Sequence, residues 1–450
     1  MQLFVCRRAA LSILRERASM PSLRGFTFAS VVLLALAGIS GQALAASNVA
    51  VGLCAAPGTH YLTIQAAVNA VELLPAPRTV RVCPGPYTEQ VMITNALALE
   101  GVSAGTSDAA VVETPSGGLI TNGSDIYGNP VAAQIFVQGA TGVTISHMTV
   151  DGSNDQLVDC SIDPIGIYYQ NSSGSINNNA VRNVLMPAGL QGCQGGLAIN
   201  VESDSGAPAI AISNNSVRNY DKNGVTASGP GTGGGPVVTV SGNTVIGIGA
   251  TGVIAQNGIQ IGFGATGTVS TNYVVDDIYT GPIYGSSGIL IYASSGVTVS
   301  GNTVESTQLG IVPATDPTYG TANGTIVKSN HIGGTQNFDA IDLCSDNNIA
   351  EMNTIYGSAQ SGVHVDDECS PSTGSGNTVT SNTINEACAG ILLGSGTGNT
   401  TAPNTFSNVT NTTMAGDVCS PVDGVPANAH DASSERHSSL RPSPSRIMKR

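Results

Sequence analysis

A histidine and three aspartates form the densest group of reactive side chains in the 450-residue sequence. Asp342 and His364 occupy equivalent positions in two copies of an internal repeat, and Asp366 and Asp367 follow the histidine closely. Carboxyl and imidazole groups can act as general acids and bases, and clustered carboxylates can bind calcium. Hydrolysis of a glycosidic bond uses two carboxyl groups at a defined separation. We therefore take these four as candidate catalytic residues, with calcium as a candidate cofactor. The alternative is that the carboxylates only keep a strand end solvated. Further acidic residues flank the group: Asp339, Asp346 and Glu368.

A second group combines tyrosines with two aspartates, mostly in a longer loop between Asn272 and Gly288. Tyrosine rings beside carboxylates suit stacking on sugar rings and hydrogen bonding to hydroxyl groups. A loop packed by its own tyrosines is the alternative. The candidate substrate-binding residues are Tyr273, Asp276, Asp277, Tyr279, Tyr284 and Tyr292.

Both groups belong to a unit that recurs along the chain. One half of the unit is a short strand that ends in a five-residue pattern with asparagine in the middle. The first residue of the pattern is small and the last is aliphatic, as in Ser241-Gly242-Asn243-Thr244-Val245. The asparagines can stack as a ladder of side-chain amides at one corner, which satisfies buried polar groups rung after rung. They are Asn179, Asn215, Asn243, Asn272, Asn302, Asn330, Asn353, Asn382 and Asn404.

The other half is a strand that begins with glycine or alanine and alternates aliphatic residues, as in Gly258-Ile259-Gln260-Ile261. The alternation has period two, so one side of this strand is buried. The residue between the two aliphatics is expected to point outward. Aligned in this way, the outward series is Tyr168, Ala198, Thr226, Gln260, Leu290, Asp342, His364 and Leu392.

The repeat predicts an all-β coil of parallel strands. Short alternating strands without an amphipathic helix in each unit exclude most helical solenoids. A β-propeller needs about 40 residues per blade and would not give so constant a corner. Before the repeats, Thr63 can N-cap a short helix whose apolar residues share one face and would cover the open end of the coil. These apolar residues are Ile64, Ala67, Val68 and Val71.

From about residue 55 to residue 410 the repeat resembles the right-handed parallel β-helix proteins of the pectin lyase-like superfamily. The segments 60–68 and 79–91 resemble the opening of pectinesterases. The resemblance implies a single-stranded right-handed parallel β-helix with an N-terminal capping helix. It also implies chemistry on an extracellular polysaccharide. The catalytic segments of pectinesterases have no counterpart in this chain.

The acidic group also resembles that of polygalacturonases, which carry aspartates on successive turns with a histidine nearby. Asp342, Asp366 and Asp367 would match those acids, and His364 the histidine. The order differs, because the histidine shares a rung with the paired aspartates. The Arg-Ile-Lys substrate clamp of that family is absent. No known pectinase activity is therefore carried across to this chain.

The ends of the chain predict export. An apolar run at 26–39 and the sequence Ala43-Leu44-Ala45 predict a signal peptide over 1–45, with Met20 as an alternative start. Residues 46–100 are expected to form the cap and first rungs, 101–425 the coil, and 426–450 a disordered tail. Eight cysteines remain after cleavage, and no Cys or His spacing suggests zinc. Their nearest-neighbour pairs are the simplest disulfide assignment among 105 connectivities. The candidate disulfide cysteines are Cys54 with Cys83, Cys160 with Cys193, Cys344 with Cys369, and Cys388 with Cys419.

The net charge of the chain limits the classes of molecule that it can bind. Residues 46–430 hold 27 acidic and six basic residues, a net charge of −21. Nucleic acid is excluded as a partner, and polyanionic pectin is poorly matched. We expect a secreted or periplasmic monomer, free of the membrane after cleavage, whose partner is a polysaccharide or a cell-surface glycan. It would act as a glycoside hydrolase or polysaccharide lyase. The alternative is a non-catalytic carbohydrate-binding or structural protein.

Overall fold

The structure is a computed structural model that describes residues 47–54, 58–103, 109–231, 234–282, 285–335, 338–370 and 373–419. The predicted signal peptide (1–45) and the predicted tail (426–450) lie outside these residues, and so does Tyr284. The described residues belong to one compact unit, 44–450.

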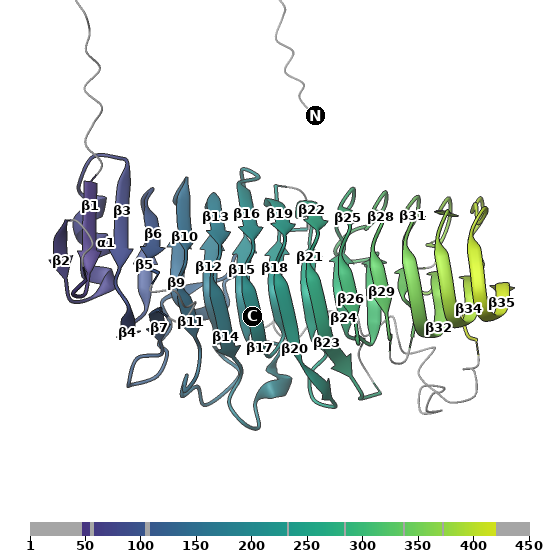
Figure 1. Cartoon of the computed structure of the whole chain (residues 1–450), viewed down its shortest axis with the longest axis horizontal. Coiled ribbons are helices and arrows are strands. Elements are labelled where there is room, and N and C mark those ends of the chain that lie inside the picture. The colour runs from purple at the N-terminus through teal and green to yellow at the C-terminus, as the bar shows by residue number, and fades with distance from the viewer. Residues whose placement is uncertain are drawn as a thin grey trace, which may run out of the picture. The chain divides into compact units, whose positions relative to one another are not determined.

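This part of the chain winds into a coil of parallel strands with three faces. The rungs follow one another in chain order, from the purple end to the yellow end of Figure 1. The first face is a 13-stranded sheet, and the second and third faces are joined into one 22-stranded sheet. Long strands near the C-terminal end contribute to both the second and third faces. The predicted parallel β-helix is confirmed.

The first two faces are built from short strands that stack along the coil. In spatial order, the first face contains β2 (Thr59–Tyr61), β1 (Ser47–Val51), β3 (Arg78–Val82), β6 (Ala98–Gly101), β10 (Val143–Ser146), β13 (Gly174–Asn177), β16 (Ala209–Ser213), β19 (Val237–Ser241), β22 (Thr266–Ser270), β25 (Thr298–Ser300), β28 (Ile326–Lys328), β31 (Ile349–Glu351) and β33 (Thr378–Thr380). The second face contains β4 (Gly85–Thr88), β7 (Ala110–Glu113), β11 (Thr149–Asp151), β14 (Ala180–Val184), β17 (Ser216–Tyr220), β20 (Thr244–Thr251), β23 (Tyr273–Tyr279), β26 (Thr303–Glu305) and β29 (His331–Gly333).

The third face carries the candidate catalytic residues. It contains β5 (Val91–Ile93), β9 (Pro130–Gln138), β12 (Asp163–Gln170), β15 (Leu197–Glu202), β18 (Asn223–Ser228), β21 (Asn257–Gly262), β24 (Ser287–Tyr292), β27 (Leu309–Ala314) and β30 (Ile341–Leu343). The long strands are β32 (Thr354–Val365), β34 (Thr383–Leu393) and β35 (Thr405–Ala415). The short β8 (Gly123–Ser124) pairs antiparallel with β9. A 3-10 turn, η1, spans Gln191–Cys193.

Each rung buries aliphatic side chains from all three faces. In one rung Val240, Val245 and Ile259 come from β19, β20 and β21, and all three are fully buried in one core. Full burial of such a side chain stabilises the fold by about 1.5–3 kcal/mol. At the corner before the third face, Gly258 lies so close to the Val274 side chain that a Cβ would clash with it. This explains why glycine recurs at the start of these strands.

The asparagine ladder is confirmed as a continuous chain of hydrogen bonds. Eight of the nine side-chain amides donate to the amide oxygen of the asparagine on the next rung, at 2.9–3.1 Å, and Asn404 ends the ladder. The same amides also donate to backbone carbonyls, as Asn243 Nδ2 does to Ile212 O at 2.9 Å. The buried amides are thus paired rung by rung, and the ladder is structural.

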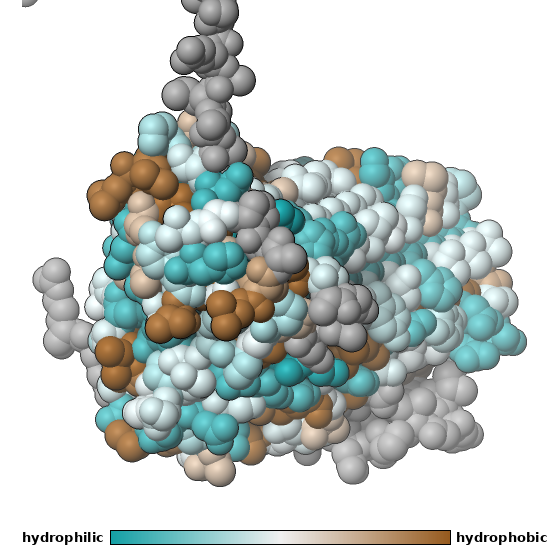
Figure 2. Space-filling view, turned by 60° about the vertical axis from the view of Figure 1, so that its left-hand side comes forward, coloured by the Kyte–Doolittle hydropathy of each residue, from teal (hydrophilic) through white to brown (hydrophobic). Residues whose placement is uncertain are grey.

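The predicted cap is α1 (Ile64–Glu72) at the N-terminal end of the coil (Figure 1). The Thr63 side chain accepts a hydrogen bond from Ala66 N, and the four predicted apolar residues are buried. Large apolar residues are exposed near this end, and Figure 2 shows the brown patches they contribute. They include Leu53, Leu62 and Leu73. Among the described residues, α1 is far too short to cross a membrane, and no other helix could do so.

The outward residues of the third face form a column along the coil. Strand pairing corrects one member of the predicted series, because Tyr168 lies beside Asn200 and not beside Ala198. The corner glycine Gly166 is matched by Ala198, whereas Gly196 precedes the strand with a positive φ of 84°. Strand pairing places the column as Phe136, Tyr168, Asn200, Thr226, Gln260, Leu290, Val312, Asp342, His364 and Leu392.

Candidate functional site

The predicted pairing of Asp342 with His364 is present. The two residues are direct partners on β30 and β32, and Asp366 follows at the end of β32. One nitrogen or oxygen atom from each of these three side chains lies within 4.8 Å of the others. The side chains point away from the aliphatic core, yet they are 2–4% exposed. We call Asp342, His364 and Asp366 the acidic cluster.

Asp339 joins the acidic cluster from the residues before β30. Its Oδ2 lies 3.5 Å from His364 Nδ1, while its Oδ1 accepts a hydrogen bond of 2.6 Å from Ser361 Oγ. Asp366 is held in a similar way, since its Oδ1 accepts from Glu368 N at 2.8 Å and its Oδ2 lies 3.7 Å from His364 Nδ1. In both carboxylates one oxygen is fixed by the protein and the other faces the imidazole.

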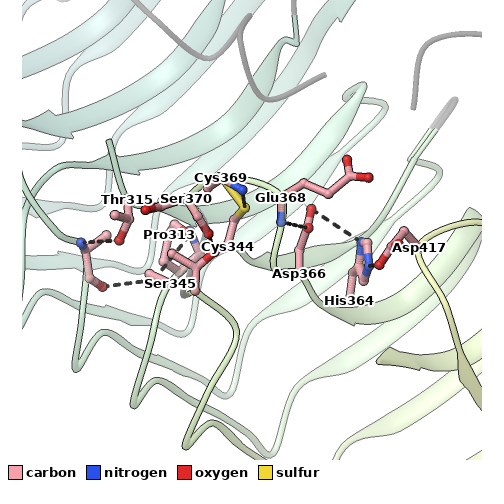
Figure 3. The surroundings of a disulfide bond; sticks show 12 residues. Pro313, Thr315, Cys344, Ser345, His364, Asp366, Glu368, Cys369, Ser370 and Asp417 are labelled. Atoms are coloured by element: carbon pink, nitrogen blue, oxygen red, sulfur yellow. Dashed lines mark hydrogen bonds and ion pairs between the residues drawn. A yellow bond between two sulfur atoms is a disulfide. The ribbon is translucent and has the colours of Figure 1, made fainter. Parts of the chain in front are cut away.

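The C-terminal segment after β35 covers the other side of the histidine. Asp417 Oδ1 lies 3.9 Å from His364 Nε2, and Figure 3 shows His364 between Asp366 and Asp417. Gln360 Nε2 donates to Asp417 O at 3.1 Å, and the disulfide of Cys419 with Cys388 ties this segment to β34. The segment is therefore anchored where it closes over the site.

All four predicted disulfides are present: Cys54–Cys83, Cys160–Cys193, Cys344–Cys369 and Cys388–Cys419. The Cys344–Cys369 bridge joins the ends of two rungs beside the acidic cluster (Figure 3). Two of the four bridges therefore brace the neighbourhood of His364.

The charges around His364 favour its protonated form. Burial acts to lower the pKa of the imidazole, but the carboxylates of Asp366, Asp339 and Asp417 outweigh it, and the pKa lies well above its usual value. The histidine is thus a cation surrounded by acids. Such a group can donate a proton or hold the carboxylates in place.

The structure leaves Asp367 out of the acidic cluster, although it follows Asp366 directly. Its Oδ2 accepts hydrogen bonds from both the backbone N and the hydroxyl of Ser395 on the next rung, the former at 2.6 Å. Adjacent residues leave a strand end in different directions, so only one of the two aspartates faces His364.

The six predicted substrate-binding residues do not form one surface. Tyr273 is 38% exposed and donates to Glu305 Oε2 at 3.3 Å. Asp277 is fully buried inside the coil, where it accepts 2.6 Å from Tyr220 Oη, and burial raises its pKa well above the usual value. A sugar at the surface cannot reach Asp277.

The tyrosines at the ends of β23 and β24 are also covered. Tyr279 and Tyr292 are buried, and Tyr292 donates a hydrogen bond to Asp316. The Tyr292 ring packs edge-on against Phe263 with 5.4 Å between centroids. Asp276 is half-buried with a positive φ of 67°, and Tyr284 lies outside the described residues.

Sequence reasoning missed a second buried carboxyl group on the third face. Glu202 ends β15 and accepts hydrogen bonds from Tyr168 Oη at 2.6 Å, Asn200 Nδ2 at 3.1 Å and Ile126 N at 3.3 Å. Burial raises its pKa to about 7, with a smaller contribution from Asp125. Glu202 lies two residues after Asn200 of the outward column, just as Asp366 lies two residues after His364. This shared position is the sequence signal that could have identified Glu202.

Comparisons with known proteins agree on the fold. The sequence profile described as the right-handed β-helix region matches residues 133–313 and, in a second overlapping match, 197–406. No curated protein matches the sequence. Among solved structures, the GH136 lacto-N-biosidase from Eubacterium ramulus is similar at a TM-score of 0.55 and 10% identity, over 80% of this chain and 67% of its own.

A second solved structure is similar to the same extent. The catalytic domain of a GH87 α-1,3-glucanase in complex with nigerose matches at a TM-score of 0.51 and 13% identity, over 82% of this chain and 66% of its own. The chain thus spans about two thirds of the length of each neighbour. At such identities the similarity concerns the architecture and not the residues of a site.

Proposed function

Because the chain belongs to the right-handed β-helix family, we propose that it is an exported glycan-active protein, a glycoside hydrolase whose reactive groups are Asp342, His364 and Asp366. The observation that carries the proposal is the convergence of these side chains within 4.8 Å on the outward side of the third face. In β-helices function resides in such outward side chains and the segments that flank them.

The acidic cluster contains the groups that hydrolysis requires. A protonated group, such as the His364 imidazolium, can give its proton to the oxygen of the leaving sugar. The groups lie within 4.8 Å, nearer the roughly 5–5.5 Å of retaining enzymes, so a carboxylate such as Asp366 would attack the sugar and form a covalent glycosyl-enzyme. A water then hydrolyses this intermediate, so that one water is consumed and one new reducing end appears. The raised pKa of His364 supports its role as the proton donor.

The expected substrate is a neutral glycan. The body of the chain carries a net charge of −21 over residues 46–430, which disfavours approach of a polyanion. The two neighbours act on neutral sugars by their names, a lacto-N-biosidase and an α-1,3-glucanase, and this supports the proposal at the level of the fold. The four disulfides support export.

The test is release of reducing ends from a panel of neutral and anionic glycans, with and without calcium. We expect activity on a neutral glycan that falls more than about 100-fold in kcat for Asp342→Asn and Asp366→Asn, the size of a lost acid or base. Glu368→Gln is the matched control, since Glu368 is exposed and does not belong to the acidic cluster. Unchanged activity in Asp366→Asn would contradict the assignment.

A non-catalytic glycan-binding protein is the second candidate. The observation in its favour is that the proposed reactive side chains are 2–4% exposed beneath the anchored Asp417 segment, so a glycan bound elsewhere on the outside of the coil would not reach them. Binding to a glycan without release of any product, in a protein whose disulfides are intact, would favour this candidate over the hydrolase.

A further inference from the structure

We propose that the acidic cluster binds a divalent transition metal of the zinc or manganese class. The donor set consists of one imidazole and two carboxylates, from His364, Asp342 and Asp366. Nitrogen and oxygen donors together suit zinc, manganese or iron, whereas calcium takes six to eight oxygen ligands. The imidazole nitrogen in this donor set favours a transition metal over calcium.

The spacing of the donor atoms fits a common ion. Two ligands that each lie about 2.1 Å from one ion can be at most about 4.2 Å apart. His364 Nδ1 lies 3.7 Å from Asp366 Oδ2 and 3.5 Å from Asp339 Oδ2, and Asp342 lies within 4.8 Å of both cluster partners. Asp342 would have to move closer to ligate the same ion, and Asp339 can serve as a fourth ligand.

His364 is the independent observation that points to a ligand. Its side chain is 2% exposed, and within the described part of the chain neither ring nitrogen has a hydrogen-bond partner. Asp339 Oδ2, which faces the imidazole, also has none among these residues. Buried polar atoms are nearly always paired, since each unpaired group is costly. An ion between these atoms would satisfy the nitrogen and the oxygen at once.

The surroundings are arranged as metal ligands require. Ligating carboxylates are themselves hydrogen-bonded in metal sites, and a ligating histidine directs its second nitrogen to a carboxylate or carbonyl. Ser361 and Glu368 N hold the outer oxygens of Asp339 and Asp366 in this way. His364 Nε2 faces Asp417 at 3.9 Å, which leaves Nδ1 for the ion. A bound ion would take the place of the Nδ1 proton of the imidazolium, because a ligating histidine is neutral. Three contacts thus orient the donors toward one point.

The inference uses the side chains of the proposed catalytic site but does not depend on hydrolysis. A metal bound there would supply an activated water to whatever reaction the site performs. Metal binding without activity would refute only the proposed hydrolase. Activity in a protein that binds no zinc or manganese in the experiment below would refute only the metal site.

The experiment is equilibrium dialysis of the chelator-stripped, disulfide-intact protein against zinc, manganese or calcium, with the bound metal counted by mass spectrometry. We expect one zinc or manganese per chain. Affinity should fall more than about 100-fold in His364→Gln and Asp366→Asn, beyond the 10- to 100-fold effect of losing a ligand's own partner. Glu368→Gln should bind as the wild type does.

A second measurement guards against variants that fail to fold. Zinc should raise the unfolding temperature of the wild type in a concentration-dependent way, since an ion that binds only the folded state stabilises it. The same shift should be absent in His364→Gln with native circular dichroism. No bound zinc or manganese, calcium alone, or equal zinc binding in His364→Gln would each overturn the proposal.

Discussion

Two buried carboxyl groups on the third face have opposite surroundings. Glu202 accepts three hydrogen bonds, from Tyr168, Asn200 and Ile126 N. In the acidic cluster Asp339 Oδ2 and both nitrogens of His364 have no hydrogen-bond partner in the part of the chain that the structure describes. Both sites are more than nine-tenths buried, so exposure does not distinguish them. Completeness of the hydrogen bonding does.

The difference separates a structural role from a ligand-binding role. Glu202 fastens the segment after β8 to β15, because Ile126 N reaches it across 76 residues of sequence. Nothing further is needed to satisfy the Glu202 carboxylate. Four carboxylates, from the acidic cluster and from Asp339 and Asp417, surround the His364 imidazole, and Asp339 Oδ2 faces His364 Nδ1 without a hydrogen bond among the described residues. An additional ligand stabilises such an arrangement. It does not stabilise the Glu202 site, where the carboxylate is already hydrogen-bonded.

The largest expected effect concerns pH and Glu202. Its pKa of about 7 in the folded protein exceeds the usual 4.5, so the folded state binds more protons between these values. The stability that Glu202 contributes is complete below pH 4.5 and is lost as pH rises to about 7, by up to about 3 kcal/mol. Denaturant unfolding across this range measures it. Glu202→Gln should remove this part of the slope, and an unchanged slope would show that Glu202 is ionised in the fold.

The sequence predicts the features that recur in every rung. It does not predict the C-terminal segment that covers His364. The asparagine ladder and the partnership of Asp342 with His364 follow from one spacing that recurs in each rung. Asp417 comes from a segment that the Cys388–Cys419 bridge folds back over the coil, and no periodicity encodes that path. The direction of Asp367 depends on Ser395 of the next rung, which pattern alignment does not reveal.

One register error shows a physical limit of the alignment. Gly166 and Gly196 look alike in sequence, but Gly166 fills a crowded corner, where a Cβ would meet Val181, and Gly196 adopts a left-handed turn. Glycine serves both needs because it has no Cβ. Aligning the two glycines shifted the strand by two residues. The shift kept the inward and outward alternation, so the error was invisible in the hydrophobic pattern.

A smaller effect is expected from removing one of the three hydrogen bonds that the Glu202 carboxylate accepts. It tests whether that hydrogen bond contributes to the stability of the fold. Tyr168→Phe keeps the ring stacked on Phe136, 4.7 Å between centroids, and removes only the 2.6 Å hydrogen bond to Glu202. We expect the free energy of unfolding at pH 7 to fall by about 1–2 kcal/mol, the cost of leaving a buried acceptor short of one donor. Equilibrium unfolding in guanidinium chloride measures the loss.

The matched control for this substitution is Tyr356→Phe. Tyr356 is 37% exposed, and its hydroxyl donates 3.0 Å to Glu305 at the surface, where water can replace the lost bond. Its unfolding free energy should change by less than about 0.5 kcal/mol. Equal losses in the two variants would mean that burial of Glu202 adds nothing to the hydrogen bond.

A small effect is also expected when Asp339, a carboxylate beside the acidic cluster, is neutralised. Asp339→Asn keeps the acceptor for Ser361 and removes one of the negative charges around His364, whose remaining acids still surround it. Lost attraction to the imidazolium and relieved repulsion among the carboxylates act in opposite directions. The unfolding free energy of metal-free protein should therefore change by less than about 1 kcal/mol, a neutral result by mutational standards. Chemical unfolding in the presence of a chelator measures it. A loss well above about 2 kcal/mol would show that Asp339 and His364 form a structural ion pair, and the contrast with Glu202 would disappear.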